Sequence, residues 1–204
     1  MLYRDVINHE HGTSDQEQLL AQRVFFAAPF PEAPDDLYAC SDQGVIERTR
    51  ARVAIGSHGQ LSTNTFFGRF PASYWQRWTE VTQVEVTAIV QGTGRIFIRA
   101  SDSVGDVRTV ASIQVDNARH EQVRLRARID RFVDGGAIWL EAFAGAAGLV
   151  LDAVRWSVAK PERVRPTAVV ICTYNRADDC LRTLATLSRD DTTLVLVDAV
   201  YVVD

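Results

Sequence analysis

The sequence lacks the features of several protein classes. Lys160 is its only lysine, its formal net charge is −4 at pH 7, and no block of basic residues occurs, so nucleic acid is not an expected partner. No apolar run approaches the roughly 20 residues that span a bilayer. The polar N-terminus also lacks the apolar centre of a signal peptide. We therefore expect a cytoplasmic protein.

Cysteine and histidine are also scarce. Cys40, Cys172 and Cys180 form neither a disulfide framework nor a zinc-binding spacing, which is typical of proteins from a reducing compartment. His9 and His11 form a His-x-His pair, but spacing identifies no third ligand. The sequence therefore predicts no metal site, and we interpret the histidines as solvated.

The composition is that of a folded globular chain. Hydrophobic residues make up 47% and charged residues 24% of the 204 positions, a balance that argues against disorder. A chain of this length holds one large domain, or one complete domain and part of another. Residues 1–22 are polar and mixed, so we expect a loosely held arm with a helical turn at residues 15–23.

Short alternating segments with glycine-rich turns dominate residues 23–158. In "EQVRLRARID", Val123, Leu125, Ala127 and Ile129 alternate with arginines, which predicts a strand with one solvated face. The stretch "QVEVTAIVQGTGRIFIRAS" predicts a hairpin that turns at Gly-Thr-Gly, residues 92–94. We expect an antiparallel β-sandwich of the jelly-roll type.

The pattern changes after "AKPERVRP", residues 159–166, which we interpret as a linker because it has two prolines and no apolar period. The apolar run that includes Val169 and Ile171 is typical of a strand buried on both faces. Leu181, Leu184 and Leu187 then follow at helical spacing, and a second apolar run ends the sequence. Residues 167–204 therefore predict the first β-α-β unit of a Rossmann-like α/β domain, with the rest of that domain missing.

The loop "CTYNR" lies where α/β sheets bind ligands, beyond the carboxyl end of a strand and before a helix N-terminus. Thr173 offers a hydroxyl, Tyr174 a flat face for a base, and Arg176 a cation for a diphosphate. Asp204 ends the next predicted strand at the same edge. This geometry suggests a nucleotide site. The alternative is an ordinary strand-to-helix turn with a solvated arginine.

The four tryptophans and Tyr74 are further candidates, either for binding a ligand or for packing within the fold. Three aromatic residues lie close together in the sequence: Tyr74, Trp75 and Trp78. They form an acceptor-binding or interface patch, or they pack against the edge of the sandwich. Trp139 and Trp156 lie in separate predicted strands, and we expect both in the core.

Three stretches carry a resemblance to a known family. "VVICTYNRADDCLRTLATL" is similar to the first strand, loop and helix of family 2 glycosyltransferases with the GT-A fold. Residues 66–101, above all "FPASYWQRW" at 70–78, resemble the N-terminal β-sandwich of the polymerising galactofuranosyltransferases of mycobacteria and related actinobacteria. "RFVDGGAIWLEA" at 131–142 resembles the same domain. The resemblance extends over residues 24–204.

The resemblance implies the N-terminal portion of an inverting glycosyltransferase. Such an enzyme transfers galactofuranose from UDP-galactofuranose to a growing lipid-linked cell-wall galactan, at the inner face of the plasma membrane. Thr173, Tyr174, Arg176 and Asp204 fall on the family's donor-nucleotide positions. Cys172 departs from the wider family, in which many members have proline there.

The resemblance also implies groups that this chain does not contain. The Asp-x-Asp metal motif and the catalytic carboxylate base belong to downstream sequence, so no catalytic residue is expected here and the chain alone is expected to be inactive. A divalent cation, Mn or Mg, is implied for the full-length enzyme, as are a homo-oligomer and peripheral contact with the membrane.

Two other functions fit parts of the sequence. The sandwich could act alone as a non-catalytic carbohydrate-binding or assembly module, with the last forty or so residues vestigial. An unrelated phosphate-binding α/β protein would fit the loop but not residues 66–101.

Overall fold

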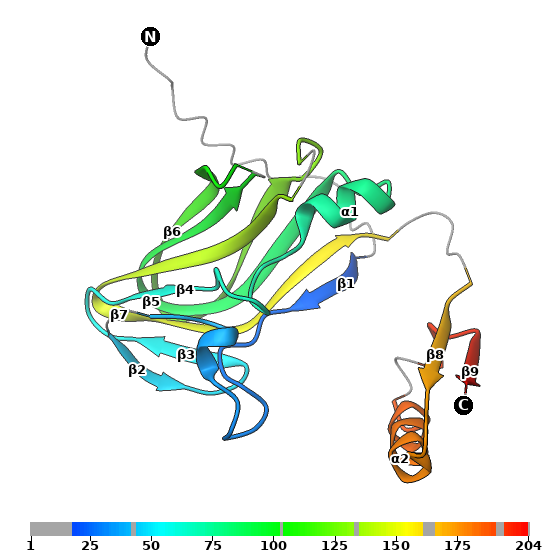
Figure 1. The fold of residues 1–204 in the computed structure, drawn as a ribbon. Coiled ribbons are helices and arrows are strands. Elements are labelled where there is room, and N and C mark those ends of the chain that lie inside the picture. The colour runs from blue at the N-terminus through cyan, green and yellow to red at the C-terminus, as the bar shows by residue number, and fades with distance from the viewer. Residues whose placement is uncertain are drawn as a thin grey trace. The chain divides into compact units, whose positions relative to one another are not determined.

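The computed structural model describes residues 18–41, 44–102, 104–132, 135–160, 166–190 and 194–203. The chain divides into two compact units, Met1–Lys160 and Pro161–Asp204, which we call the β unit and the second unit (Figure 1). Most of the expected N-terminal arm, His9, His11, most of the expected linker and Asp204 lie outside the described residues.

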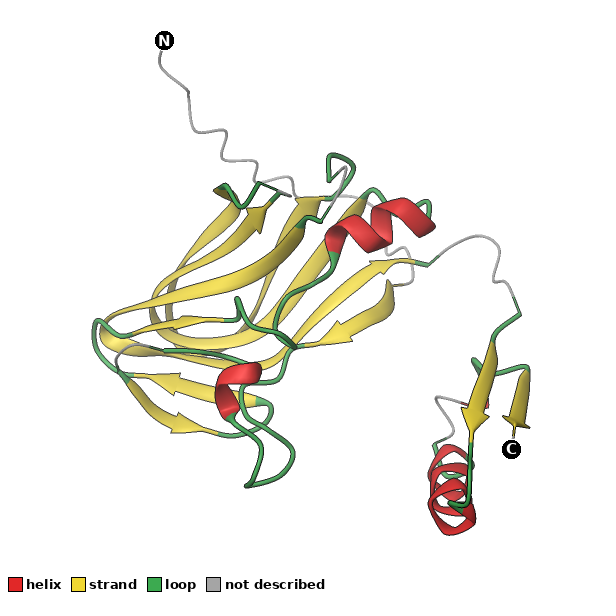
Figure 2. Ribbon diagram, viewed as in Figure 1, coloured by secondary structure: helices red, strands yellow, loops and turns green. Residues whose placement is uncertain are grey.

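The described part of the β unit is mainly β structure, with one α-helix and one short 3-10 helix, Asp35–Leu37 (Figure 2). Its strands and helix are β1 (Gln18–Arg23), β2 (Val45–Arg48), β3 (Arg52–Ile55), β4 (Gln60–Ser62), α1 (Ala72–Trp78), β5 (Gln83–Ser101), β6 (Val107–Arg128) and β7 (Ala137–Ala159).

Within the described residues, seven strands form one sheet in which every pairing is antiparallel. The order is β2-β3-β7-β5-β6, and β1 and β4 also pair with β7. The central strand β7 therefore holds the sheet together, because four strands, β1, β3, β4 and β5, pair with it along its length. The prediction of a mainly antiparallel β fold is confirmed.

The predicted hairpin at residues 83–100 is wrong, because β5 continues through Gly92 and Gly94 as one strand of 19 residues. Both glycines have positive φ, +107° and +156°, and the register with β7 shifts between them. A Cβ atom at Gly92 would lie 2.2 Å from the carbonyl oxygen of Gly148, and one at Gly94 2.3 Å from that of Phe143. The glycines therefore allow close approach of β7 and a bulge rather than a chain reversal.

Both halves of β5 line one hydrophobic core. Val86 and Val90 before the glycines, and Ile96 and Ile98 after them, are buried in the same cluster. The long strands β5, β6 and β7 curve along their length (Figure 1), so that inward side chains from both halves gather in this core. Apolar burial of this kind is the main favourable contribution to folding.

The alternation predicted for β6 is confirmed. Val123, Leu125 and Ala127 are buried, whereas the arginines between them are exposed. Arg126 donates to Glu85 on β5 with Nε 2.8 Å from Oε2. At the end of the strand, the hydrogen bond from Arg128 lowers the pKa of the Asp130 carboxyl.

The helix α1 packs onto the sheet through aromatic rings. Trp75 stacks on Phe70 at 5.6 Å between ring centroids, and Phe70 lies 5.3 Å from Trp156. Gln76 of the same helix donates to the Asp130 carbonyl oxygen at 2.8 Å. Burial of Trp156 confirms its predicted place in the core. Trp139 is also buried, but it is not part of this core cluster.

At its N-terminus, the β unit differs from the sequence prediction. Residues Gln18–Arg23 form β1, which pairs antiparallel with β7, where we expected the end of a polar arm and a helical turn. Leu19 and Ala21 pack against the core. Pairing with the central strand therefore overrides the weak local preference of this polar segment.

The second unit contains β8 (Ala168–Cys172), α2 (Ala177–Leu187) and β9 (Ala199–Val203). The two strands pair in parallel, as the sequence predicts for a β-α-β unit. Helix α2 presents Cys180, Leu184 and Leu187 as its less exposed side, whereas Leu181, expected on that side, is exposed.

Phenylalanines 70 and 66 offer a matched test of the core, since their exposed fractions are 0% and 79%. We expect Phe70→Ala to lower the free energy of unfolding by about 3–5 kcal/mol, because it removes a ring between two tryptophans and leaves a cavity. Phe66→Ala should change it by no more than about 0.5 kcal/mol. Urea unfolding followed by tryptophan fluorescence measures both, and equal effects would contradict this packing.

Alanine variants of Gly92 and Gly105 distinguish the stability cost of close backbone packing from the cost of backbone strain. Both have positive φ, but no described atom lies within 4 Å of a Cβ built at Gly105. We expect Gly105→Ala to cost about 1 kcal/mol for the backbone conformation alone. Gly92→Ala should cost about 3 kcal/mol or more, because the new methyl group would also overlap the β7 backbone. Equal losses in urea unfolding would show that the approach of β7 to Gly92 is not tight.

Candidate functional site

The loop Thr173–Arg176 connects β8 to α2 at the carboxyl end of the parallel pair. The Thr173 N–H donates to the Val203 carbonyl oxygen at 2.8 Å, so the residue after β8 is still bonded to the last residue of β9. This bond fixes the start of the loop relative to β9. The predicted loop residues Thr173, Tyr174 and Arg176 are therefore placed together at the end of the sheet where α/β proteins bind ligands.

The side chains of this loop differ in exposure. The Thr173 hydroxyl oxygen is buried and has no hydrogen-bond partner among the described residues, whereas Tyr174 is 82% exposed. Asn175 between Tyr174 and Arg176 has φ +53°, a left-handed conformation that asparagine tolerates better than most residues. Asn175 lies in the bend between β8 and α2. The sequence prediction does not include Asn175, although asparagine is a residue type that favours such bends.

The N-terminus of α2 supplies unpaired backbone donors. Arg176 is the N-cap residue, no side chain caps the helix, and the first helical bond runs from Cys180 N–H to the Arg176 carbonyl oxygen at 3.0 Å. The preceding N–H groups of the first turn have no intrahelical acceptor. Asp178 and Asp179 occupy this turn, and Asp179 pairs with Arg182 at 3.0 Å. The exposed Arg176 is the cationic residue of the loop itself.

Asp204, the fourth predicted donor-site residue, lies outside the described residues. Its neighbour Val203 pairs with Cys172 in the parallel register. The structure therefore brings together three of the four predicted residues in one continuous loop and leaves the fourth as a prediction.

The aromatic residues of α1 are divided between two environments. Trp75 is half-buried on Phe70, so the packing interpretation holds for this ring. Tyr74 and Trp78 are exposed on the β unit, and the guanidinium of Arg77 lies 5.6 Å from the Trp78 ring centroid. These two rings remain candidates for contact with an acceptor or another surface.

No group of three or more histidine, cysteine or acidic residues that could hold a metal ion occurs in the part of the chain that the structure describes. The described residues Cys40, Cys172 and Cys180 form no disulfide bond with one another. Among the described helices, none is both long enough and apolar enough to cross a membrane.

Comparison with known proteins gives a family match within the β unit. A family model described as "Galactofuranosyltransferase 2 N-terminal" matches residues 35–159. "Galactofuranosyltransferase GlfT2" of Mycolicibacterium smegmatis is 34% identical over 159 residues, which cover 76% of this chain and 24% of that protein. The protein of the same name from Mycobacterium tuberculosis is 30% identical over 159 residues, 76% of this chain and 25% of its own length. The chain thus spans about a quarter of the length of the curated relatives it matches.

The comparison with solved structures gives matches of low sequence identity and low TM-score. The CBM22-1 and GH10 modules of Clostridium thermocellum xylanase 10B, complexed with xylohexaose, align with a TM-score of 0.42 at 10% identity. The alignment covers 82% of this chain and 36% of that chain.

Proposed function

The chain belongs to the galactofuranosyltransferase 2 N-terminal family, and on that premise we propose that it is the N-terminal portion of an inverting glycosyltransferase. The enzyme would transfer galactofuranose from UDP-galactofuranose to a growing lipid-linked cell-wall galactan. The observation that carries the proposal is the order of parts: the family's β unit is followed by a parallel β-α-β unit. The polar loop of this second unit lies at the sheet edge where α/β proteins generally bind ligands.

We propose that the second unit opens a GT-A nucleotide-sugar domain and that the β unit is the jelly-roll-like sandwich preceding it. Parallel strands are normally buried on both faces, yet Val170, Val200 and Val202 of β8 and β9 are exposed. Further strands and helices of a complete GT-A domain would cover these residues. The length of the curated relatives, about four times the matched segment, supports this interpretation.

The loop residues have separate proposed roles toward UDP. The Arg176 guanidinium and the free N–H groups of α2 would bind the diphosphate, since both favour anions. The Tyr174 ring would stack against the uracil. The Thr173 hydroxyl, which has no hydrogen-bond partner among the described residues, would form a hydrogen bond to UDP. Asp204 would accept hydrogen bonds from the ribose or the uracil N–H.

The residues described here do not supply the remaining chemistry. A divalent cation, Mn or Mg, would neutralise the leaving UDP, but no metal-binding cluster occurs among the described residues. We therefore assign the cation ligands and the carboxylate base that deprotonates the acceptor hydroxyl to other parts of the full-length enzyme. The 204-residue chain alone should bind donor without turnover.

The acceptor sets the expected location and partners. Because the proposed galactan acceptor is lipid-linked, we place the enzyme at the inner face of the plasma membrane as a peripheral protein. We also propose, from the family resemblance, that the enzyme forms a homo-oligomer.

Two arginines of the second unit give a matched test of UDP binding. We expect Arg176→Ala to weaken binding of UDP to this chain about tenfold, because a charge-assisted hydrogen bond is lost. Arg182→Ala should bind like the unmodified chain, because Arg182 pairs with Asp179 on the helix rather than in the loop. Saturation-transfer NMR with UDP measures both affinities.

An equal loss in the two variants would show that α2 contributes only general positive charge. No UDP signal with the unmodified chain would contradict the assignment of the loop as the donor site.

A further inference from the structure

The outward-facing side of the sheet carries a second group of chemically distinctive side chains. In β7, Ile138, Leu140 and Ala142 point into the core, so Glu141 and Phe143 point to the opposite side. On the neighbouring β5, Phe97 is paired with Glu141 and lies on the same side. We call the outward side chains of these two strands the outer face: Arg95, Phe97, Arg99, Trp139, Glu141 and Phe143.

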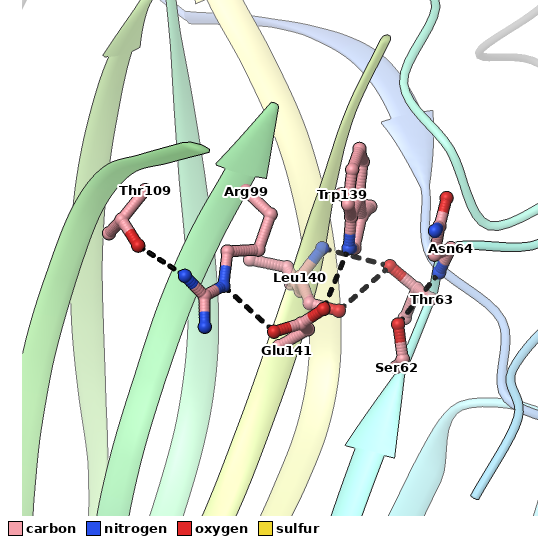
Figure 3. Close-up of polar contacts among 8 residues, drawn as sticks. All are labelled: Ser62, Thr63, Asn64, Arg99, Thr109, Trp139, Leu140 and Glu141. Atoms are coloured by element: carbon pink, nitrogen blue, oxygen red, sulfur yellow. Dashed lines mark hydrogen bonds and ion pairs between the residues drawn. The ribbon is translucent and has the colours of Figure 1, made fainter. Parts of the chain in front are cut away.

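The Glu141 carboxylate is held in a fixed orientation at the centre of the outer face. Arg99 donates from Nε to its Oε2 at 2.8 Å, and the indole N–H of the buried Trp139 donates to its Oε1 at 3.2 Å. Figure 3 shows Arg99 reaching Glu141 on one side and Thr109 of β6 on the other. The side chains of Arg99 and Glu141 are 26% and 22% exposed, so the pair is preorganised but reachable from solvent.

Two aromatic rings lie beside this pair. Phe97 and Phe143 meet edge to face with centroids 5.6 Å apart. The guanidinium groups of Arg95 and Arg99 lie 5.1 and 4.7 Å from the Phe97 centroid. The Phe143 ring is 38% exposed, so it offers an apolar surface next to fixed hydrogen-bonding groups.

A pocket of about 190 Å³ adjoins Phe143 and Glu141. Its other walls come from β4 and the segment before β2, and the residues lining them are Cys40, Ser41, Gln60, Leu61 and Ser62. Ser62 of β4 is paired with Glu141 and Gln60 with Phe143. The pocket therefore joins one aromatic ring and one carboxylate to hydroxyl, amide and backbone groups.

The chemistry of the pocket discriminates among ligand classes. A phosphate or other anion would meet Glu141, and the adjacent Arg99 already pairs with that carboxylate. An aliphatic chain would leave the remaining acceptor sites of the Glu141 carboxylate without hydrogen bonds, which is costly. A neutral polyhydroxylated ligand satisfies both kinds of surface, since its hydroxyl groups donate to Glu141 and its apolar C–H groups stack on Phe143.

We propose that the pocket and outer face around Glu141 and Phe143 bind a saccharide, separately from the nucleotide loop of the second unit. Glu141 accepts one hydrogen bond at each oxygen from the protein, which leaves about two of its four acceptor sites for sugar hydroxyl groups. Arg99 and Arg95 have further N–H donors along the same face. The choice of a galactofuranose oligomer as the sugar rests on the proposed function.

The test measures binding of a galactofuranose hexasaccharide to the 204-residue chain by isothermal titration calorimetry, with a glucose hexasaccharide in parallel. We expect Phe143→Ala and Glu141→Gln each to weaken binding about tenfold, with folding checked by circular dichroism. The matched controls are Phe30→Ala, another exposed phenylalanine outside the pocket, and Arg176→Ala in the nucleotide loop. Both controls should bind the oligomer like the unmodified chain.

Three outcomes would overturn the site: no binding of either hexasaccharide, binding that neither Phe143→Ala nor Glu141→Gln weakens, or binding lost only in Trp78→Ala, which would place the sugar on α1. Binding of the glucose oligomer in place of the galactofuranose oligomer, weakened by Phe143→Ala, would support the site and count against the proposed galactan substrate.

Discussion

The β unit depends on the close contact between the backbones of β5 and β7 at Gly92 and Gly94. Strands of 19, 22 and 23 residues run side by side through the whole unit, and straight strands of this length could not enclose a core. The missing side chains at Gly92 and Gly94 let the carbonyl oxygens of Gly148 and Phe143 approach, and the register shift there disrupts the ladder locally. Both halves of one hydrogen-bonded sheet therefore contribute side chains to the same core.

The same strands fix the chemistry of the outer face. Because side chains alternate along a strand, a core that selects Ile138, Leu140 and Ala142 inward also directs Trp139, Glu141 and Phe143 outward. Leu140 bonds through its backbone to the buried Thr63, with its N–H 3.0 Å from the threonine hydroxyl oxygen (Figure 3). The positions of Glu141 and Phe143 are therefore set by core packing on the opposite side of the strand. A binding surface on such a rigid scaffold loses little conformational entropy when a ligand binds.

Periodicity predicted much of this structure because it reflects burial directly. The alternation of Val123 to Ile129 and the β-α-β order of the second unit follow from it. Gly-Thr-Gly at 92–94 led to the wrong prediction of a hairpin, because glycines with positive φ occur in hairpin turns and in bulges alike. Only the pairing with the distant strand β7 distinguishes the two. The helical spacing predicts Leu181 on the buried side of α2, but the neighbouring Cys180 is the buried residue and Leu181 is exposed. The Glu141 site could not be predicted, since Arg99 and Glu141 are far apart in sequence and meet only through strand register.

The nucleotide loop was easier to recognise, because strand, polar loop and helix are contiguous in the sequence. Its proposed role connects the two units in one function: donor binding at Thr173 to Arg176 and saccharide binding on the β unit. The most direct measurement of that function is galactofuranose transfer by the full-length protein, given UDP-galactofuranose, Mn or Mg and a lipid-linked galactofuranosyl acceptor. We predict that UDP is released and the acceptor lengthens by galactofuranose units. Absence of both with a folded protein would contradict the proposed function.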